Sequence, residues 1–228
     1  LISSGLDQKT AKGTGVKVKI KTPENITLVT AEQYANAAIT AGVTDAEIEV
    51  AAVSKVTGES ALTGVYKAFE ANGVQLDSKR TEVAQQELEV TNKIAQENAN
   101  AKGFDSSKLD KAMIEIKKEL AELKQKQGQL ATKEDIERII NDALKNNSLQ
   151  NVISQDQINA LVAFAQNYQN TSAIDSKQVL EQLNSLSKSV GEKINSLVEQ
   201  AKNEGWLDKI AQFFQLIFDA IKNLFSQN

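Results

Sequence analysis

Residues 206–228 place the strongest single constraint on how this chain can fold. Large apolar side chains recur there at steps of three and four residues, with polar residues between them, which predicts an amphipathic helix over residues 206–226. Burying one such side chain is worth roughly 1.5–3 kcal/mol, so we expect this stripe to be covered. The side chains of this predicted docking helix are Trp206, Leu207, Ile210, Phe213, Phe214, Ile217, Phe218, Ile221, Leu224 and Phe225.

Three surfaces could cover the predicted docking helix. The first is the chain's own helical region, and the second is a partner protein or a second copy of the chain. The third is a membrane surface, which the aromatic side chains suit. Helices that lie on membranes usually have a basic polar face, whereas the charges of Asp208, Lys209, Asp219 and Lys222 cancel here.

The composition removes several classes of chemistry. The chain has no histidine and no cysteine, so it lacks the commonest general base and cannot form disulfides or thiolate metal sites. Its net charge of −4 disfavours nucleic acid as a partner. No run of 18 apolar residues occurs, so we expect no membrane-spanning helix. We therefore predict no enzyme activity, no cofactor and no metal.

Residues 16–75 predict a small α/β layer. The segment Val16–Ile20 alternates apolar and lysine residues, as a half-buried strand does, and a second short strand is expected at residues 26–29. Thr30 and Gln33 form the capping box of a helix over residues 31–41. Alternation from residue 46 predicts a third strand, and a second helix follows over residues 61–72.

The predicted layer is thin, with three or more strands and two helices. We therefore expect further strands upstream of Leu1, and an edge near residues 16–20 that is exposed or filled by another chain. Residues 1–15 are polar and glycine-containing, which predicts a flexible N-terminal segment. The row of Lys17, Lys19 and Lys21 is either a binding patch or, as is commoner for strands, a solvated face.

From residue 76 to residue 228 the pattern is helical, so the fold class is α+β. A heptad seam of Leu109, Met113, Ile116, Leu120 and Leu123 predicts packing inside a helical bundle, or else a short intermolecular coiled coil. Two capping boxes predict a helical hairpin over residues 132–170. A long helix over residues 176–203 precedes the docking helix.

Three stretches, residues 29–70, 132–162 and 207–225, resemble a YpuA-like family of uncharacterised secreted proteins of Gram-positive bacteria. The resemblance implies a location outside the cytoplasmic membrane, in the cell envelope or the medium. It also implies an export signal and an upstream α/β segment, so that Leu1 lies inside the mature protein. The family has no assigned activity, so no site residues are carried over.

The remaining motifs give weak signals for chemistry. Thr57, Gly58 and Ser60 resemble a phosphate-binding loop, but they lack its lysine and fit a turn with a helix cap. Ser60 as a nucleophile would need Lys55 or Lys67 as its base. Glu47 and Glu49 share a strand face that is more simply solvated. The segment 146–158 lacks the alternating acidic ligands and the closing glutamate of a calcium loop. The scattered Asp105, Asp110 and Asp175 are expected to cap helices or to lie in solvent.

The sequence thus predicts a non-catalytic, extracytoplasmic protein that acts by protein–protein interaction or self-association. One alternative is a protein that binds a membrane surface through residues 206–226. Another is an envelope enzyme with a site near Thr57–Ser60.

Overall fold

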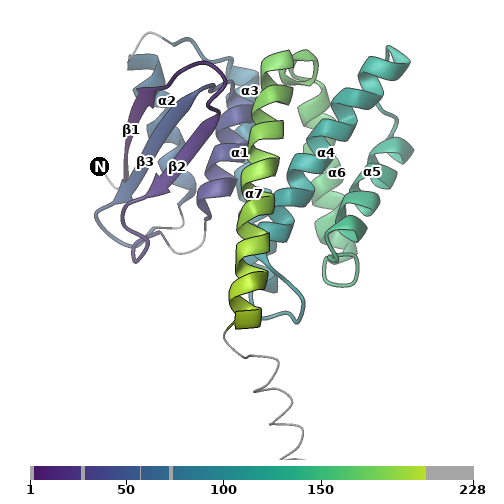
Figure 1. The fold of residues 1–228 in the computed structure, drawn as a ribbon. Coiled ribbons are helices and arrows are strands. Elements are labelled where there is room, and N and C mark those ends of the chain that lie inside the picture. Colours follow the sequence, from purple (N-terminus) through teal and green to yellow (C-terminus); the bar gives the residue numbers. More distant parts are fainter. Residues whose placement is uncertain (1–2, 27–28, 57, 72–73, 204–228) are drawn as a thin grey trace, which may run out of the picture. The chain divides into compact units, whose positions relative to one another are not determined.

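The computed structural model describes residues 3–26, 29–56, 58–71 and 74–203. The chain divides into two units, Leu1–Val190 and Gly191–Asn228. The packing described below belongs to the first unit, and the described part of the second is the C-terminal end of the last helix. The first unit combines a small sheet with a larger group of helices (Figure 1), which confirms the α+β class.

The sheet contains β1 (Ser3–Lys9), β2 (Val16–Ile20) and β3 (Ala46–Ala52) in the order β1-β3-β2. β3 is central, antiparallel to β1 and parallel to β2. Residues 3–9 were expected to belong to a flexible segment, and that expectation is wrong, because they pair with β3 along their whole length. The strand expected at residues 26–29 is reduced, in its described part, to one bridge between Ile26 and Val56.

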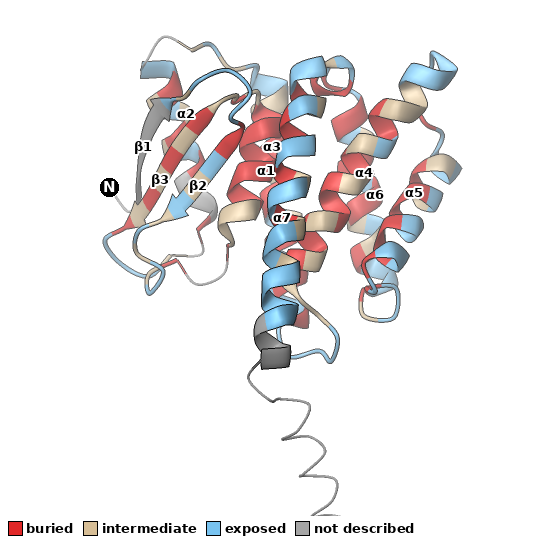
Figure 2. Ribbon diagram, in the orientation of Figure 1, coloured by how far each residue is buried: buried red, intermediate tan, exposed pale blue. Residues whose placement is uncertain are grey.

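One face of the sheet is buried by helices α1 (Ala31–Ala41) and α2 (Glu59–Ala71). Every second residue of β3 is buried, from Ala46 through Ile48 and Val50 to Ala52, and the residues between them are partly exposed (Figure 2). A sheet with one solvated face is expected to alternate in this way. The capping box of Thr30 and Gln33 starts α1, and Gly42 ends it in the left-handed conformation, both as predicted.

The helical region continues with α3 (Ser78–Asn98), α4 (Ser106–Gln127), α5 (Lys133–Asn146), α6 (Gln155–Gln169) and α7 (Lys177–Asn203), and a 3₁₀ turn spans Ser172–Asp175. α3 packs on α1, and α6 packs on α3. α5 and α6 form the predicted helical hairpin, and each begins with its predicted capping box.

The heptad seam of α4 packs inside the chain. Leu109, Met113, Ile116 and Leu120 are all buried, and α4 contacts α5, α6 and α1. Internal packing, the first of the two predicted uses of the seam, is therefore confirmed.

Asp45 joins the end of the sheet to α7. It lies just before β3 in the left-handed conformation, with a φ of 47°. Its carboxylate accepts hydrogen bonds from the backbone N–H groups of Gly13 (2.9 Å) and Gly15 (3.0 Å) and from the Gln182 side chain of α7 (3.2 Å). Partial desolvation raises the pKa of Asp45, but these hydrogen bonds outweigh it and hold the pKa below its ordinary value of 3.8.

We predict that Asp45→Asn lowers stability at neutral pH but not at acidic pH. Asparagine tolerates the left-handed backbone, so the change mainly removes the charge. A carboxyl group with a lowered folded-state pKa stabilises the protein above its unfolded pKa, and this contribution is lost as the pH falls through the folded pKa. Urea unfolding followed by circular dichroism should show a deficit of about 1 kcal/mol at pH 7. The deficit should shrink at pH 3, and an equal deficit at both pH values would contradict this role.

Candidate functional site

The edge of β2 that faces away from β3 is open in the described part of the chain. Ala46 N–H donates to the Gly15 carbonyl (3.1 Å) and Lys21 N–H to the Val50 carbonyl (2.8 Å), so odd-numbered residues around β2 bond to β3. Parallel pairing alternates along a strand. The backbone N–H and C=O groups of Val16, Val18 and Ile20 therefore point away from β3, where no described strand pairs with them. Val16 is only 6% exposed, since Ser185 of α7 lies close to the start of β2, so the accessible part of the open edge is at Val18 and Ile20.

A hollow of about 280 Å³ runs along this open edge. Its lining from β2 and the preceding turn is Thr14, Val16, Lys17, Val18 and Lys19, and from the helices it is Ala31, Glu32, Ala35, Ser185, Leu186 and Ser189. Val16 is buried, whereas Val18 and Ile20 are only half-buried. The volume of the hollow is near the lower end of the about 300–1,000 Å³ that is usual for ligand pockets, and its position along a strand edge suits the side chains of an extended segment. We call it the β2-edge groove.

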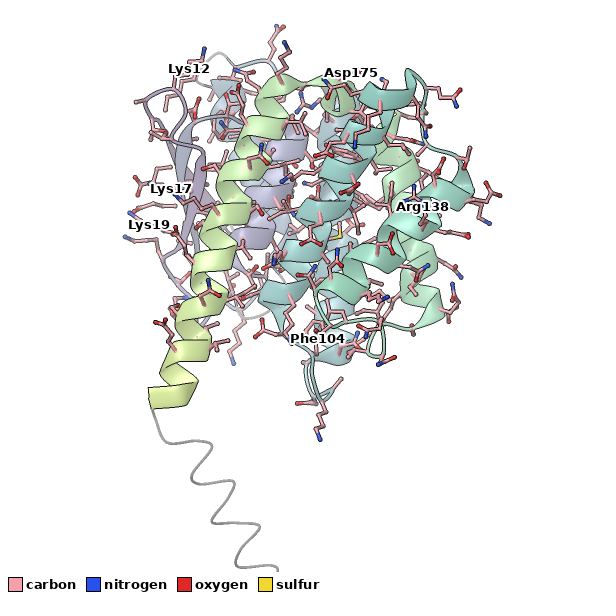
Figure 3. The ribbon with its side chains drawn as sticks, turned by 45° about the vertical axis from the view of Figure 1, so that its right-hand side comes forward. Lys12, Lys17, Lys19, Phe104, Arg138 and Asp175 are labelled. Atoms are coloured by element: carbon pink, nitrogen blue, oxygen red, sulfur yellow. The ribbon has the colours of Figure 1, made fainter. Side chains whose placement is uncertain are left out.

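The lysine side chains belong to the solvated face of the sheet, although Lys17 and Lys19 also border the β2-edge groove. Lys17 and Lys19 point away from the helices (Figure 3). Lys19 pairs with Glu47, and Lys21 pairs with Glu49 at 3.3 Å. The hydrogen bond between Lys19 and Glu47 raises the pKa of the lysine and lowers that of the glutamate. The two glutamates therefore do not form an acid pair but belong to a solvated strand face, as the simpler interpretation predicted.

A second cluster of charges, which the sequence analysis missed, lies deep among the helices. The Lys117 ammonium of α4 contacts the Glu87 carboxylate of α3 at 2.8 Å, and both side chains are essentially inaccessible to solvent. Lys117 also donates to the Asn36 carbonyl (3.1 Å) and to the Thr40 hydroxyl (3.0 Å) of α1, and that hydroxyl donates to Glu87 at 2.5 Å. Three helices thus meet at one ion pair.

Aromatic and cationic groups surround this buried pair. The Lys117 ammonium lies 5.8 Å from the centre of the Tyr168 ring of α6, within the range of a cation–π contact. Burial lowers the pKa of Lys117, although Glu87 opposes that shift. Burial, reinforced by Glu87, raises the pKa of the Tyr66 and Tyr168 hydroxyls. Tyr168 and Tyr66 therefore stay neutral near pH 7.

The side chains of the buried pair are shielded from solvent, with 0% exposure for Lys117 and 2% for Glu87. Its role is to connect helices. A signal for it was present in the sequence, since Lys117 lies four residues after Met113 and three before Leu120, which places it on the apolar face of α4. Glu87 lies likewise four residues after Val83 and three after Ala84, which are buried residues of α3.

The described residues of the phosphate-loop motif fit a turn and do not converge with the two lysines considered as bases. Gly58 is buried, has a φ of 96°, and its carbonyl accepts a hydrogen bond from the Tyr34 hydroxyl at 2.6 Å, which fits the predicted turn. Lys55 and Lys67 are exposed and line neither cavity. Thr57 and the Ser60 side chain lie outside the described residues.

The aspartates that were expected to cap helices or to lie in solvent separate into three cases. Asp105 caps α4, as expected. Asp175 lies at the surface and pairs with Lys124. For Asp110 the expectation is wrong, since it is buried and accepts a hydrogen bond from the Thr30 hydroxyl at 3.0 Å.

The side chains of the predicted docking helix, residues 206–226, lie outside the described residues, so that part of the hypothesis stays a prediction.

A second hollow, of about 400 Å³, lies between α4 and α5. Its charged lining residues are Glu115, Lys118, Glu119, Glu122, Arg138 and Asp142. Several of them are already paired, for example Arg138 with Asp142 and Glu122 with Lys126.

Among the residues that the structure describes, no three acidic side chains converge in a geometry that could hold a metal ion. None of the described helices has the length and hydropathy needed to cross a membrane.

Comparison with known proteins assigns the chain to a class whose members have no established activity. Residues 1–186 match a family described as "Protein of unknown function (DUF1002)", and the chain belongs to this family. It is also similar to the uncharacterised protein YpuA of Bacillus subtilis strain 168, with 34% identity over 229 residues that cover 98% of this chain and 71% of YpuA. The resemblance to a YpuA-like family is thereby confirmed. No solved structure matches.

We predict that the buried pair is strongly coupled in stability. Lys117→Met leaves the Glu87 carboxylate buried without its cation, which should cost about 3–5 kcal/mol of unfolding free energy. Adding Glu87→Gln removes that charge, so the double variant should be more stable than Lys117→Met alone. Urea unfolding of the native chain, both single variants and the double variant measures the coupling. Strictly additive losses would contradict it.

Proposed function

We propose that this chain is a non-catalytic protein of the cell envelope or the extracellular medium that works by binding another protein chain. The observation that carries the proposal is the open edge of β2. Unpaired backbone donors and acceptors in a row are a template for pairing with another chain, and proteins that do not use such an edge usually block it. The half-buried Val18 and Ile20 beside the β2-edge groove add apolar surface that a partner would cover.

The ionisable groups support binding more than catalysis. The most buried pair, Glu87 and Lys117, is enclosed by its own hydrogen bonds. Glu47 and Glu49 are bound to lysines at the surface. A reaction site needs a nucleophile or base that meets substrate in a concave pocket, and the residues considered for one, Lys55 and Lys67, lie away from both hollows. An envelope enzyme near Thr57–Ser60 is therefore the weaker proposal.

The proposed location rests on the resemblance to a family of secreted proteins. A chain without cysteine needs no disulfide to fold, which is compatible with an oxidising or a reducing surrounding. Fractionation of the bacterium that produces the protein should place it in the wall fraction or the culture medium. Recovery in the cytoplasm alone would contradict the proposed location. The proposal that the chain binds another protein would still stand.

We predict that a partner can be cross-linked from the open edge of β2. The photoreactive amino acid benzoylphenylalanine would replace Lys17, and cells would be irradiated and analysed by immunoblotting for adducts of higher mass. We expect an adduct that disappears when Val18→Pro is added. Proline removes the N–H that faces the open edge without removing a bond to β3, and sheets tolerate it on edge strands.

The control places the same photoreactive residue at Lys102, an exposed position in the turn between α3 and α4. That protein should give no adduct that depends on Val18. Absence of any adduct from position 17, or an adduct that persists with Val18→Pro, would contradict binding through the edge.

A further inference from the structure

We propose that the open edge of β2 accepts an extended segment of a partner protein in which acidic and aliphatic side chains alternate, and that this segment becomes a fourth strand of the sheet. The inference rests on the proposed function and names the chemistry of the partner. Three features of the edge specify that chemistry: its backbone groups, the floor of the β2-edge groove and the lysine row.

The backbone groups require an extended partner. Val18 and Ile20 present their N–H and C=O groups two residues apart, a spacing of about 6.6 Å along a parallel strand. Another extended backbone repeats its own donors and acceptors at the same interval. A helix satisfies its backbone groups internally, so it cannot match this row.

The groove specifies the side chains on one face of the added strand. Alternate side chains would point toward α1 and α7, onto a floor that contains Ala31, Ala35 and Leu186. Ala35 and Leu186 are both buried, at 2% and 7% exposure. A hollow of about 280 Å³ admits aliphatic side chains of moderate size. Valine and similar residues therefore fit this face of the segment.

The lysine row specifies the other face. Side chains on the solvated face of a fourth strand would lie next to Lys17 and Lys19, since directly opposed Cβ atoms on neighbouring strands are about 4.5–5.5 Å apart. Lys19 already shares its charge with Glu47, whereas Lys17 is exposed and makes no ion pair among the described residues. An acidic side chain opposite Lys17 would complete the cross-strand pattern that Glu47 and Glu49 form on the other side of β2.

The same charges argue against a second copy of the chain at this edge. Pairing of β2 with β2 would bring the lysine rows of both copies next to each other, and like charges on directly opposed strands are destabilising. The apolar side chains of the two β2 strands could pack together, but their lysines would repel each other. The charges of the edge therefore favour a partner of different sequence.

The test uses two blocked, fluorescently labelled peptides, one of alternating glutamate and valine and a matched one with lysine in place of glutamate. Fluorescence anisotropy at low salt, with the full chain, should show binding of the glutamate peptide at least about tenfold tighter than the lysine peptide. NMR should locate the change at the amides of Val18 and Ile20. Val18→Pro should weaken binding about tenfold or more by removing a main-chain hydrogen bond.

Charge variants test whether the preference for the glutamate peptide comes from the lysine row or from the net charge of the protein. Lys17→Glu should reduce the preference for the glutamate peptide about tenfold, while Lys102→Glu, with the same change in net charge, should leave the preference unaltered. Circular dichroism confirms that each variant is folded. Equal binding of both peptides, or binding that is insensitive to Val18→Pro, would overturn the proposal.

Three further outcomes show whether this inference fails alone or together with the proposed function. If the cross-linked adduct forms and depends on Val18 but the glutamate peptide does not bind, the edge binds a partner of other chemistry, and only this inference fails. If light scattering shows a dimer that Val18→Pro converts to a monomer, the occupant is a second copy, and the inference also fails. If neither adduct nor peptide binding is seen, both proposals fail.

Discussion

The contact on which the rest of this structure depends is the buried ion pair of Glu87 and Lys117. Removing two charges from water costs several kcal/mol per ion, and the attraction between them recovers that cost only when the remaining hydrogen bonds are made. Here they are supplied by Thr40 and by the carbonyl of Asn36. Thr40 and Asn36 belong to α1, Glu87 to α3 and Lys117 to α4, so the pair is satisfied only when all three helices are in place.

This requirement links the helical region to the sheet. α1 carries Thr40 on the side that meets the ion pair and packs its other side on β2. Arg80 of α3 strengthens the same junction, because its guanidinium donates to the carbonyls of Ile39 and Thr40 at the end of α1. The position of α1 in turn sets the floor of the β2-edge groove. The interior pair and the surface groove are therefore two consequences of how one helix is held.

Much of the local structure could be predicted from the sequence. The capping residues Thr30, Thr132 and Ser154 start helices where expected, because a cap is formed by residues three positions apart. The strand at Val16–Ile20 followed from alternation alone. The strand at residues 3–9 was missed, because its residues Ser3–Lys9 show no regular apolar alternation and form a strand only through pairing with β3.

The sequence by itself determined the fold class, the bounds of most helices and the absence of histidine and cysteine chemistry, since these depend on composition and on neighbours within a few positions. Only the tertiary structure decided that Glu47 and Glu49 bind lysines, that Lys117 is buried beside Glu87, and that β2 forms an open edge of the sheet. These facts join residues about 30 positions apart. Strand order and the pairing of charges arise when distant segments pack, and no local pattern specifies which segments will meet.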